Sequence, residues 1–278
     1  MQLNPVYGSD PLIVVDGPPS AVLEPVVRQR RRMVAELESL GPDDWGRPSR
    51  CEGWSVRDVV VHLDSTNAFW SMSIGAGVAG SPTTFLADFD PVATPAALVE
   101  LSDAPPLQAF ERFVASTESL CDLLEGLDEP GWDALAETPA GHVSVAALAH
   151  HALWDSWVHE RDVFLALGRT PVVEADEVAA SLAYVAALSP AFSLSRGRGL
   201  SGVLGLSVTD PAIALTIEVA DQVRIGLEEP TEADLVLRGD AVELLEALSV
   251  RRDLGIDVAP GVAWMVDGLR EVFEVSSS

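Results

Sequence analysis

Residues 144–168 read SVAALAHHALWDSWVHERDVFLALG, and the spacing of their apolar residues predicts one long helix. We expect it to begin near Ser144 and to end at Gly168, a C-cap glycine that is followed by Pro171. Three of the five histidines fall on this helix, at positions 150, 151 and 159. The rest of the chain can be interpreted outward from this segment.

One face of this helix is polar although the helix is otherwise apolar. Successive residues turn by about 100°, so four polar residues fall within about 80° of one another: His151, Asp155, His159 and Asp162. Asp155 and His159 are four residues apart, which brings a carboxylate oxygen and an imidazole nitrogen close enough to converge on one ion. The same spacing also fits a simple hydrogen-bonded pair, and the spacing alone does not decide between the two interpretations.

Three more helices are predicted upstream, over residues 20–40, 55–75 and 106–126. The first stops at Gly41-Pro42, and the second opens on the capping box Ser55-Val56-Arg57-Asp58. Glycines weaken the end of the second helix, at positions 75, 77 and 80. Four helices joined by short or moderate loops predict an antiparallel bundle.

His62 is the natural third ligand for an ion held by Asp155 and His159. It lies in the middle of the second predicted helix among Val59, Val60 and Leu63, where an isolated imidazole would need a hydrogen-bond partner in the core. The competing interpretation is a partly buried core histidine.

In the second half of the chain the spacing of the apolar residues changes from a helical to a strand-like period. After a helical stretch over residues 174–188, residues 213–219 and 223–227 alternate as half-buried strands do, with Ala220-Asp221-Gln222 as a hairpin loop. Further strands are expected at 203–208 and 235–237, and helices at 241–248 and 262–273. The prediction is an α+β chain, with a four-helix bundle over residues 1–172 and a small α+β domain with an antiparallel sheet over residues 173–278.

Composition excludes several classes of function. The formal net charge of −26 repels phosphate backbones and anionic membranes, so we expect neither nucleic acid nor membrane as a partner. The basic cluster Arg28, Arg30, Arg31 and Arg32 is interpreted as a solvated helix face. Because no secretory signal is visible and we expect no apolar run long enough to span a bilayer, we expect a cytoplasmic protein. The only cysteines, Cys51 and Cys121, are far apart, which favours nitrogen and oxygen as metal ligands.

Three motifs carry a resemblance to a known family. The first is LGPDDW at residues 40–45 with PSRCEGWSVRDVVVHL at 48–63, and the second is DSWVHERDV at 155–163 with ALG at 166–168. The third is DLVLRGDA at residues 234–241, followed by Leu244-Leu245 and Arg251. In this order and over nearly the whole chain, they resemble the mycothiol-dependent maleylpyruvate isomerase family, whose metal-binding domain is a DinB-like four-helix bundle.

The resemblance implies one divalent ion, zinc or nickel, held by His62, Asp155 and His159. The family has glutamate where this chain has Asp155, which shortens that ligand by one methylene. His151 could compensate as a ligand one turn earlier, and Asp162 could orient a ligand imidazole through its second nitrogen. The alternatives are an ordinary hydrogen-bonding role for His151 and a salt bridge to a neighbouring arginine for Asp162.

Two residues outside the ligand set receive a prediction as well. Arg251 aligns with an arginine that the family associates with activity, and its guanidinium could clamp a substrate carboxylate. The alternative for Arg251 is a charge at a helix C-terminus, and Arg252 beside it leaves the assignment open. Cys51 precedes the second helix and is expected to be structural.

The implied function is a metal-dependent enzyme that uses mycothiol, the small thiol of actinobacteria. The thiolate either adds to a cis double bond and is eliminated after rotation, or is transferred to an electrophile. Because the chain departs from the family at Asp155, thiol transfer to a small electrophile is favoured over isomerisation of an unsaturated acid. The alternative is a binding module without catalysis that holds a metal and a small apolar ligand. We expect a monomer or a weak homodimer.

Overall fold

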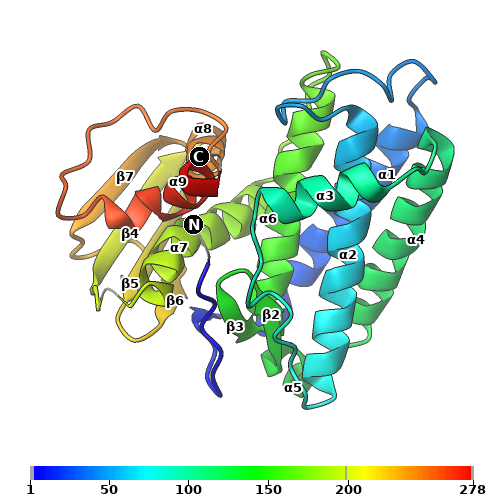
Figure 1. Cartoon of the computed structure of the whole chain (residues 1–278). Coiled ribbons are helices and arrows are strands. Elements are labelled where there is room, and N and C mark those ends of the chain that lie inside the picture. Colours follow the sequence, from blue (N-terminus) through cyan, green and yellow to red (C-terminus); the bar gives the residue numbers. More distant parts are fainter. Residues whose placement is uncertain (1–2, 198, 277–278) are drawn as a thin grey trace.

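The computed structural model describes residues 3–197 and 199–276 and shows a helix bundle beside a layer of sheet and helices (Figure 1). The bundle consists of four long helices: α1 (Leu23–Glu38), α2 (Val56–Val78), α4 (Pro106–Glu125) and α6 (Val145–Phe164). Each corresponds to a helix that the periodicity predicts. The α+β fold class, with a four-helix bundle followed by an α+β region, is confirmed.

Local signals in the sequence explain where the two site-bearing helices begin. At Ser55 the side chain accepts from the backbone N–H of Asp58, and the Asp58 side chain accepts from the Ser55 N–H, so the capping box is confirmed. Ser144 caps α6 by accepting from Ala147 N. The helix itself ends at Phe164, and a turn continues to Gly168, whose φ of +75° lies in the left-handed region.

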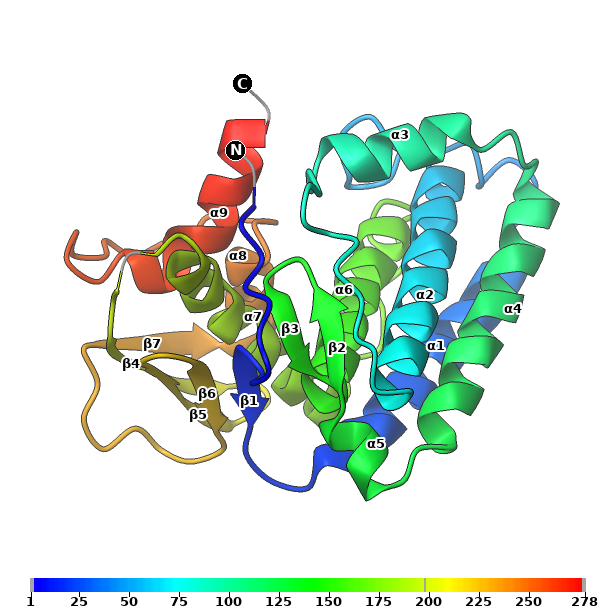
Figure 2. The ribbon, with the colours of Figure 1, turned by 60° about the horizontal axis from the view of Figure 1, so that its bottom comes forward.

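Several short elements before and between the bundle helices are not predicted by the periodicity. They are the 3-10 helix η1 (Pro19–Val22), α3 (Ala93–Leu101), α5 (Glu129–Asp133), and a hairpin of β2 (Leu135–Thr138) and β3 (Gly141–Ser144). The hairpin leads directly into α6, and β2 packs against α2. Figure 2 shows α3 lying across one end of the bundle.

The second half contains α7 (Ala175–Ser195), α8 (Ala241–Leu248), α9 (Trp264–Ser276) and a five-stranded sheet of order β1-β6-β5-β4-β7. Its strands are β4 (Gly202–Thr209), β5 (Ile213–Val219), β6 (Val223–Gly226), β7 (Leu235–Asp240) and β1 (Ile13–Val15). The pairs β4–β5 and β5–β6 are antiparallel, as predicted, whereas the edge strands β1 and β7 run parallel to their neighbours. The sheet is therefore mostly, and not wholly, antiparallel.

The N-terminal segment connects the two halves of the molecule. Ile13 pairs with Val223 and Val15 with Ile225, so residues near the start of the chain complete the sheet formed mainly by its end. One continuous hydrophobic core runs from the bundle, through Trp157 and Tyr184, to Ile217 and Leu237 in the sheet. The expected division between residues 172 and 173 stays a prediction. Strand β1 lies before this division in the sequence but pairs with β6, which lies after it.

The basic cluster on α1 is a solvated face only at Arg31, which is exposed, so that interpretation is wrong for Arg30 and Arg32. Arg30 is fully buried and donates to Asn67 Oδ1 and, at 2.9 Å, to the carbonyl of Ala152. Arg32 reaches two buried carboxylates, Glu160 at 2.9 Å and Glu177 at 2.7 Å. The ion pairs of Arg32 join α1 to α6 and α7, and the hydrogen bonds of Arg30 to neutral groups join α1 to α2 and α6.

Helix α7 corrects the expectation about apolar runs. It contains an 18-residue window that is long and apolar enough to cross a membrane by length and composition alone. Of that window, 78% is buried inside the protein. Its apolar side chains pack against the bundle, the sheet and α9, which is typical of a central core helix.

Candidate metal centre

Three side chains from two bundle helices converge at one point. His62 comes from α2, and Asp155 and His159 lie one turn apart on α6. One ligand atom of each lies within 4.8 Å of the others. Asp155 Oδ1 is 3.9 Å from His62 Nε2 and 3.6 Å from His159 Nε2. The structure thus brings together all three residues proposed as ligands from the sequence.

The chemistry of this group fits a divalent cation. Asp155 Oδ2 is buried and has no hydrogen-bond partner among the residues that the structure describes, which is costly for a carboxylate oxygen unless a cation or water takes its lone pairs. Two imidazole nitrogens and one carboxylate oxygen form a set that zinc accepts, with further coordination positions left for other ligands. The role of these residues as ligands stays a prediction.

Charge at the site is arranged around Asp155. Burial alone would raise the pKa of Asp155, but His62 and His159 hold it well below its ordinary value. Burial lowers the pKa of His62, so this ring is neutral at neutral pH. Burial would lower the pKa of His159 as well, but Cys51, Asp162 and Asp155 together raise it to about 10. Without a metal, a protonated His159 therefore faces an ionised Asp155.

A second layer of residues fixes His159. Its Nδ1 lies 3.1 Å from Asp162 Oδ2, the orienting contact expected for Asp162. Asp162 also forms a salt bridge, but with the distant Arg251 and not with an arginine of its own helix: Arg251 donates to this carboxylate from Nε at 3.0 Å and from Nη2 at 2.8 Å. Arg251 comes from the turn after α8, so the α+β region contributes directly to the centre.

His151 does not join the ligand group. Its Nδ1 lies 2.8 Å from the hydroxyl of Tyr184, and its ring stands edge-on to Trp70 and Trp154. Burial lowers the pKa of His151 to about 4, so the imidazole is neutral. In this arrangement His151 has the ordinary hydrogen-bonding role that the sequence left open.

Cys51 is the residue whose position the sequence interpretation missed. Ser49 N donates to Trp54 O at 2.9 Å, so the segment before α2 folds back on itself, and Arg50 N donates to Asp162 O at 2.9 Å. The Cys51 thiol consequently lies 3.2 Å from Asp162 Oδ2 and 3.6 Å from His159 Nδ1. The available signal was its place within the first family motif, next to the cap at Ser55.

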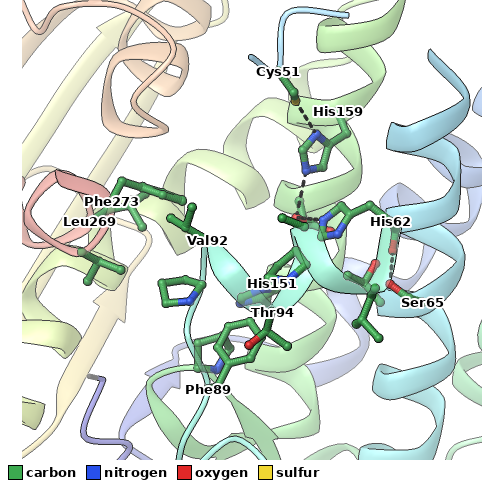
Figure 3. A pocket seen from close by; sticks show the side chains of 18 of the residues that line it. Cys51, His62, Ser65, Phe89, Val92, Thr94, His151, His159, Leu269 and Phe273 are labelled. Atoms are coloured by element: carbon green, nitrogen blue, oxygen red, sulfur yellow. Dashed lines mark hydrogen bonds and ion pairs between the residues drawn. The ribbon is translucent and has the colours of Figure 1, made fainter. Parts of the chain in front are cut away.

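The centre opens into a large cavity of about 960 Å³. The bundle contributes one face of α2 and one of α6. The other walls come from α7, α9, the turn after α8, α3 with the segment leading into it, the segment before α2 and the turn between β2 and β3. Figure 3 shows His62 and His159 apart from Phe89, Leu269 and Phe273, which also line the cavity. A molecule bound between the bundle and the α+β region could therefore reach the histidines.

Comparisons with known proteins agree on one family. The model of the mycothiol maleylpyruvate isomerase N-terminal domain matches residues 26–164, a span that contains His62, Asp155 and His159. The crystal structure of the mycothiol-dependent maleylpyruvate isomerase is similar with a TM-score of 0.60 at 16% identity, covering 85% of this chain and 91% of that one. A mutant of that isomerase gives 0.61 at 16% identity, with 88% and 95% covered. At this identity the likeness shows a shared fold. No curated protein matched the chain.

Proposed function

Because the chain belongs to the mycothiol maleylpyruvate isomerase family, we propose that it is a metal- and mycothiol-dependent enzyme that transfers the thiol to, or isomerises, a small electrophilic or unsaturated substrate. One observation carries the proposal: His62, Asp155 and His159 converge at a cavity, and Asp155 Oδ2 lacks a partner within the described structure. We propose these three residues as the ligands of a divalent ion, zinc or nickel.

The ion would stabilise the negative charge of a thiolate, so that a thiol could bind there in its deprotonated form at neutral pH. The residues of this chain orient the ligands of the ion and form the walls around them. Asp162 holds the ring of His159 by its Nδ1 and leaves Nε2 facing Asp155. The apolar walls exclude water from the inner end of the cavity, which strengthens electrostatic interactions there. We place the thiol and its partner substrate in the cavity, between the bundle and the α+β region.

Asp155 supports thiol transfer as the favoured reaction. Its side chain is one methylene shorter than the glutamate of the family, so an ion in this centre would lie differently relative to the cavity. Arg251, proposed as the catalytic arginine, donates to Asp162 and also borders the cavity. We infer that it positions the centre, with any contact to substrate made by the remaining guanidinium edge.

Cobalt substitution tests the proposal directly. Mycothiol is titrated into the cobalt-loaded protein, and sulfur coordination should add a charge-transfer band in the near ultraviolet that saturates with the thiol. The Cys51→Ala variant is titrated in parallel, because the Cys51 thiol lies 3.6 Å from His159 and could give such a band by itself. A fully loaded Cys51→Ala protein whose spectrum does not respond to mycothiol or to another small thiol overturns the proposed thiol chemistry.

The rival function is a binding module that keeps the metal centre without catalysis. The cavity favours it in one respect, since its walls suit a small apolar ligand whether or not a reaction follows. Chelation separates the two functions. An enzyme of the proposed kind loses turnover when the metal is removed, whereas a binding module retains its apolar ligand and shows no thiol-dependent turnover in either state.

A further inference from the structure

The body of the cavity is built from aromatic side chains. Phe69 and Trp70 come from α2, Trp154 from α6, Phe192 from α7 and Phe273 from α9, and Phe89 precedes α3. These rings belong to elements from both halves of the chain, so the apolar surface surrounds the space and is not one-sided. Aromatic walls of this kind bury large apolar groups and stack against rings.

Several polar groups on the α2 and α6 walls already have hydrogen-bond partners within the protein, whereas Trp70 Nε1 and, at the metal centre, Asp155 Oδ2 have none among the described residues. The hydroxyl of Ser65 donates to the carbonyl of His62 at 2.7 Å, and that of Thr66 donates to the carbonyl of Leu63 at 3.1 Å. Nδ1 of His151 is taken by the Tyr184 hydroxyl. Apart from the Trp70 N–H and the metal centre, a substrate rich in hydroxyl or carboxylate groups would find few free partners for its polar groups along these two walls.

Within the described part of the chain, the positively charged side chains that line the cavity lie at the end near the metal centre, and each is paired with a carboxylate. Among the lining residues that the structure describes, the arginines are Arg50 and Arg251. Arg50 pairs with Glu246 at 2.8 Å, and Arg251 with Asp162 at 2.8 Å. The chain as a whole carries a net charge of −26. The acidic chain would therefore repel a small dicarboxylate as it approaches, and the two arginines in the cavity would already be paired with carboxylates of the protein.

From these three observations we propose that the substrate bound in the aromatic part of the cavity, as distinct from the thiol, is uncharged, largely apolar and of drug-like size, with an aromatic body packed among these rings. The identification of its reactive end, an electrophilic carbon facing His62, Asp155 and His159, rests on the proposed function. The apolar body does not, because it follows from the walls alone. The volume of about 960 Å³ lies at the upper end of ligand pockets, so the cavity has room for a body larger than a short-chain acid even when part of it holds the thiol.

Binding of N-phenyl-1-naphthylamine, an uncharged aromatic probe that fluoresces in apolar surroundings, tests the proposal. We expect saturable binding to the zinc-loaded protein, with energy transfer from tryptophan because Trp70 and Trp154 line the cavity. A large excess of maleate, a small dicarboxylate, should not displace the probe. A carboxylate placed in the wall by Phe89→Asp or Phe273→Asp should weaken probe binding by about tenfold or more, since it must be desolvated beside the probe.

Matched variants keep the test decisive. Leu107→Asp introduces the same charge at an exposed position on α4 outside the cavity and should bind the probe like the parent. Circular dichroism shows whether a charged variant has misfolded. Phe89→Leu keeps the wall apolar and should bind the probe, so it gives a second measurement at this position if Phe89→Asp does not fold. The proposal is overturned if the probe does not bind, if maleate displaces it, or if folded Phe89→Asp and Phe273→Asp proteins both bind it as tightly as Leu107→Asp.

The probe also separates this inference from the proposed function. Probe binding should persist in His159→Ala, because the aromatic walls do not depend on the metal. A protein that binds the probe but shows no cobalt response to mycothiol keeps the apolar cavity and loses the thiol chemistry. A protein that responds to mycothiol but ignores the probe keeps the thiol chemistry and loses the apolar substrate.

Discussion

Nδ1 of His159 lies 3.1 Å from Oδ2 of Asp162, and this contact fixes the ring that turns Nε2 towards Asp155. Asp162 is in turn held by Arg251, which lies 89 residues further along the chain. The metal centre is thus oriented across the boundary between the bundle and the α+β region. Partners of this kind commonly set the basicity and the angle of a ligand imidazole.

Arg251→Ala should weaken zinc binding, by about 10-fold to 100-fold, because Asp162 would lose the group that holds it against His159. Arg252→Ala is the matched control, since Arg252 is exposed and pairs only with Glu243 among the ion pairs found in the structure. Competition with a chromophoric chelator measures both affinities. If Arg251→Ala binds zinc like the parent yet loses turnover of an acidic substrate, Arg251 clamps substrate and does not position the centre.

His159→Ala should abolish binding of about one divalent ion per chain, because it removes a nitrogen ligand from a site of three protein ligands. His150→Ala is the control on the same helix. Its Nδ1 is 2.8 Å from the Ala146 carbonyl and it stands outside the ligand group. Elemental analysis of the purified proteins should find metal in the parent and in His150→Ala only. Equal metal in all three proteins would show that the ligand set is wrong.

Asp155 offers a graded test of the carboxylate ligand. Asp155→Glu should retain metal, because the family carries the longer carboxylate at this position, whereas Asp155→Asn should bind more weakly because the negative charge is lost. The order of affinities, parent and Glu above Asn, is measured with the same chelator. An Asp155→Asn variant that binds zinc as tightly as the parent would show that Asp155 is not a ligand. His151, one turn earlier, would then be the next residue to test.

The helices and the ligand residues could be predicted because their signals are local. Periodicity, the capping box at Ser55 and the one-turn spacing of Asp155 and His159 depend on neighbours in sequence. By contrast, the parallel pairing of Ile13 with Val223 joins a three-residue strand to a distant partner, and no short-range pattern encodes it. The burial of Arg30 depends on Asn67 and Ala152, which only the folded bundle brings near.

Cys51 and the cavity were missed for the same reason. The thiol meets His159 because the chain reverses between Ser49 and Trp54, and that reversal becomes visible only when its hydrogen bonds are known. The cavity walls come from both halves of the chain, so no single segment carries an aromatic pattern that reveals them.

Zinc affinity should rise with pH over the neutral range. His159 has a pKa of about 10 in the metal-free fold against an ordinary 6.5, so it carries a proton at neutral pH that must leave before Nε2 can bind the ion. His62 contributes no such proton, because burial lowers its pKa. We therefore expect up to about a tenfold gain in affinity per pH unit from one released proton. Calorimetry in two buffers of different ionisation enthalpy counts the proton, and a count of zero would show that His159 is neutral.

The raised pKa of His159 also predicts how the stability of the metal-free protein changes as the pH rises. A group whose pKa is raised by folding stabilises the fold fully below its unfolded value, here about 6.5, and loses that contribution as pH rises through about 10. The apo-protein should therefore become less stable to urea between these values. In His159→Ala this part of the pH dependence should be absent, and its persistence would assign it to another group.

Two glycines near the end of α2 should respond oppositely to the same substitution. A Cβ on Gly77 would come 1.9 Å from the carbonyl oxygen of Leu135, so Gly77→Ala must push α2 away from β2 and should cost about 1–3 kcal/mol of unfolding free energy. At Gly75 a Cβ meets nothing within 4 Å, and Gly75→Ala should add up to about 1 kcal/mol through helix propensity. Urea unfolding of the two variants measures the difference. Because β2 leads through β3 into α6, Gly77→Ala should also loosen zinc binding while Gly75→Ala leaves it unchanged, and equal stability of the two variants would show that α2 does not depend on this close approach.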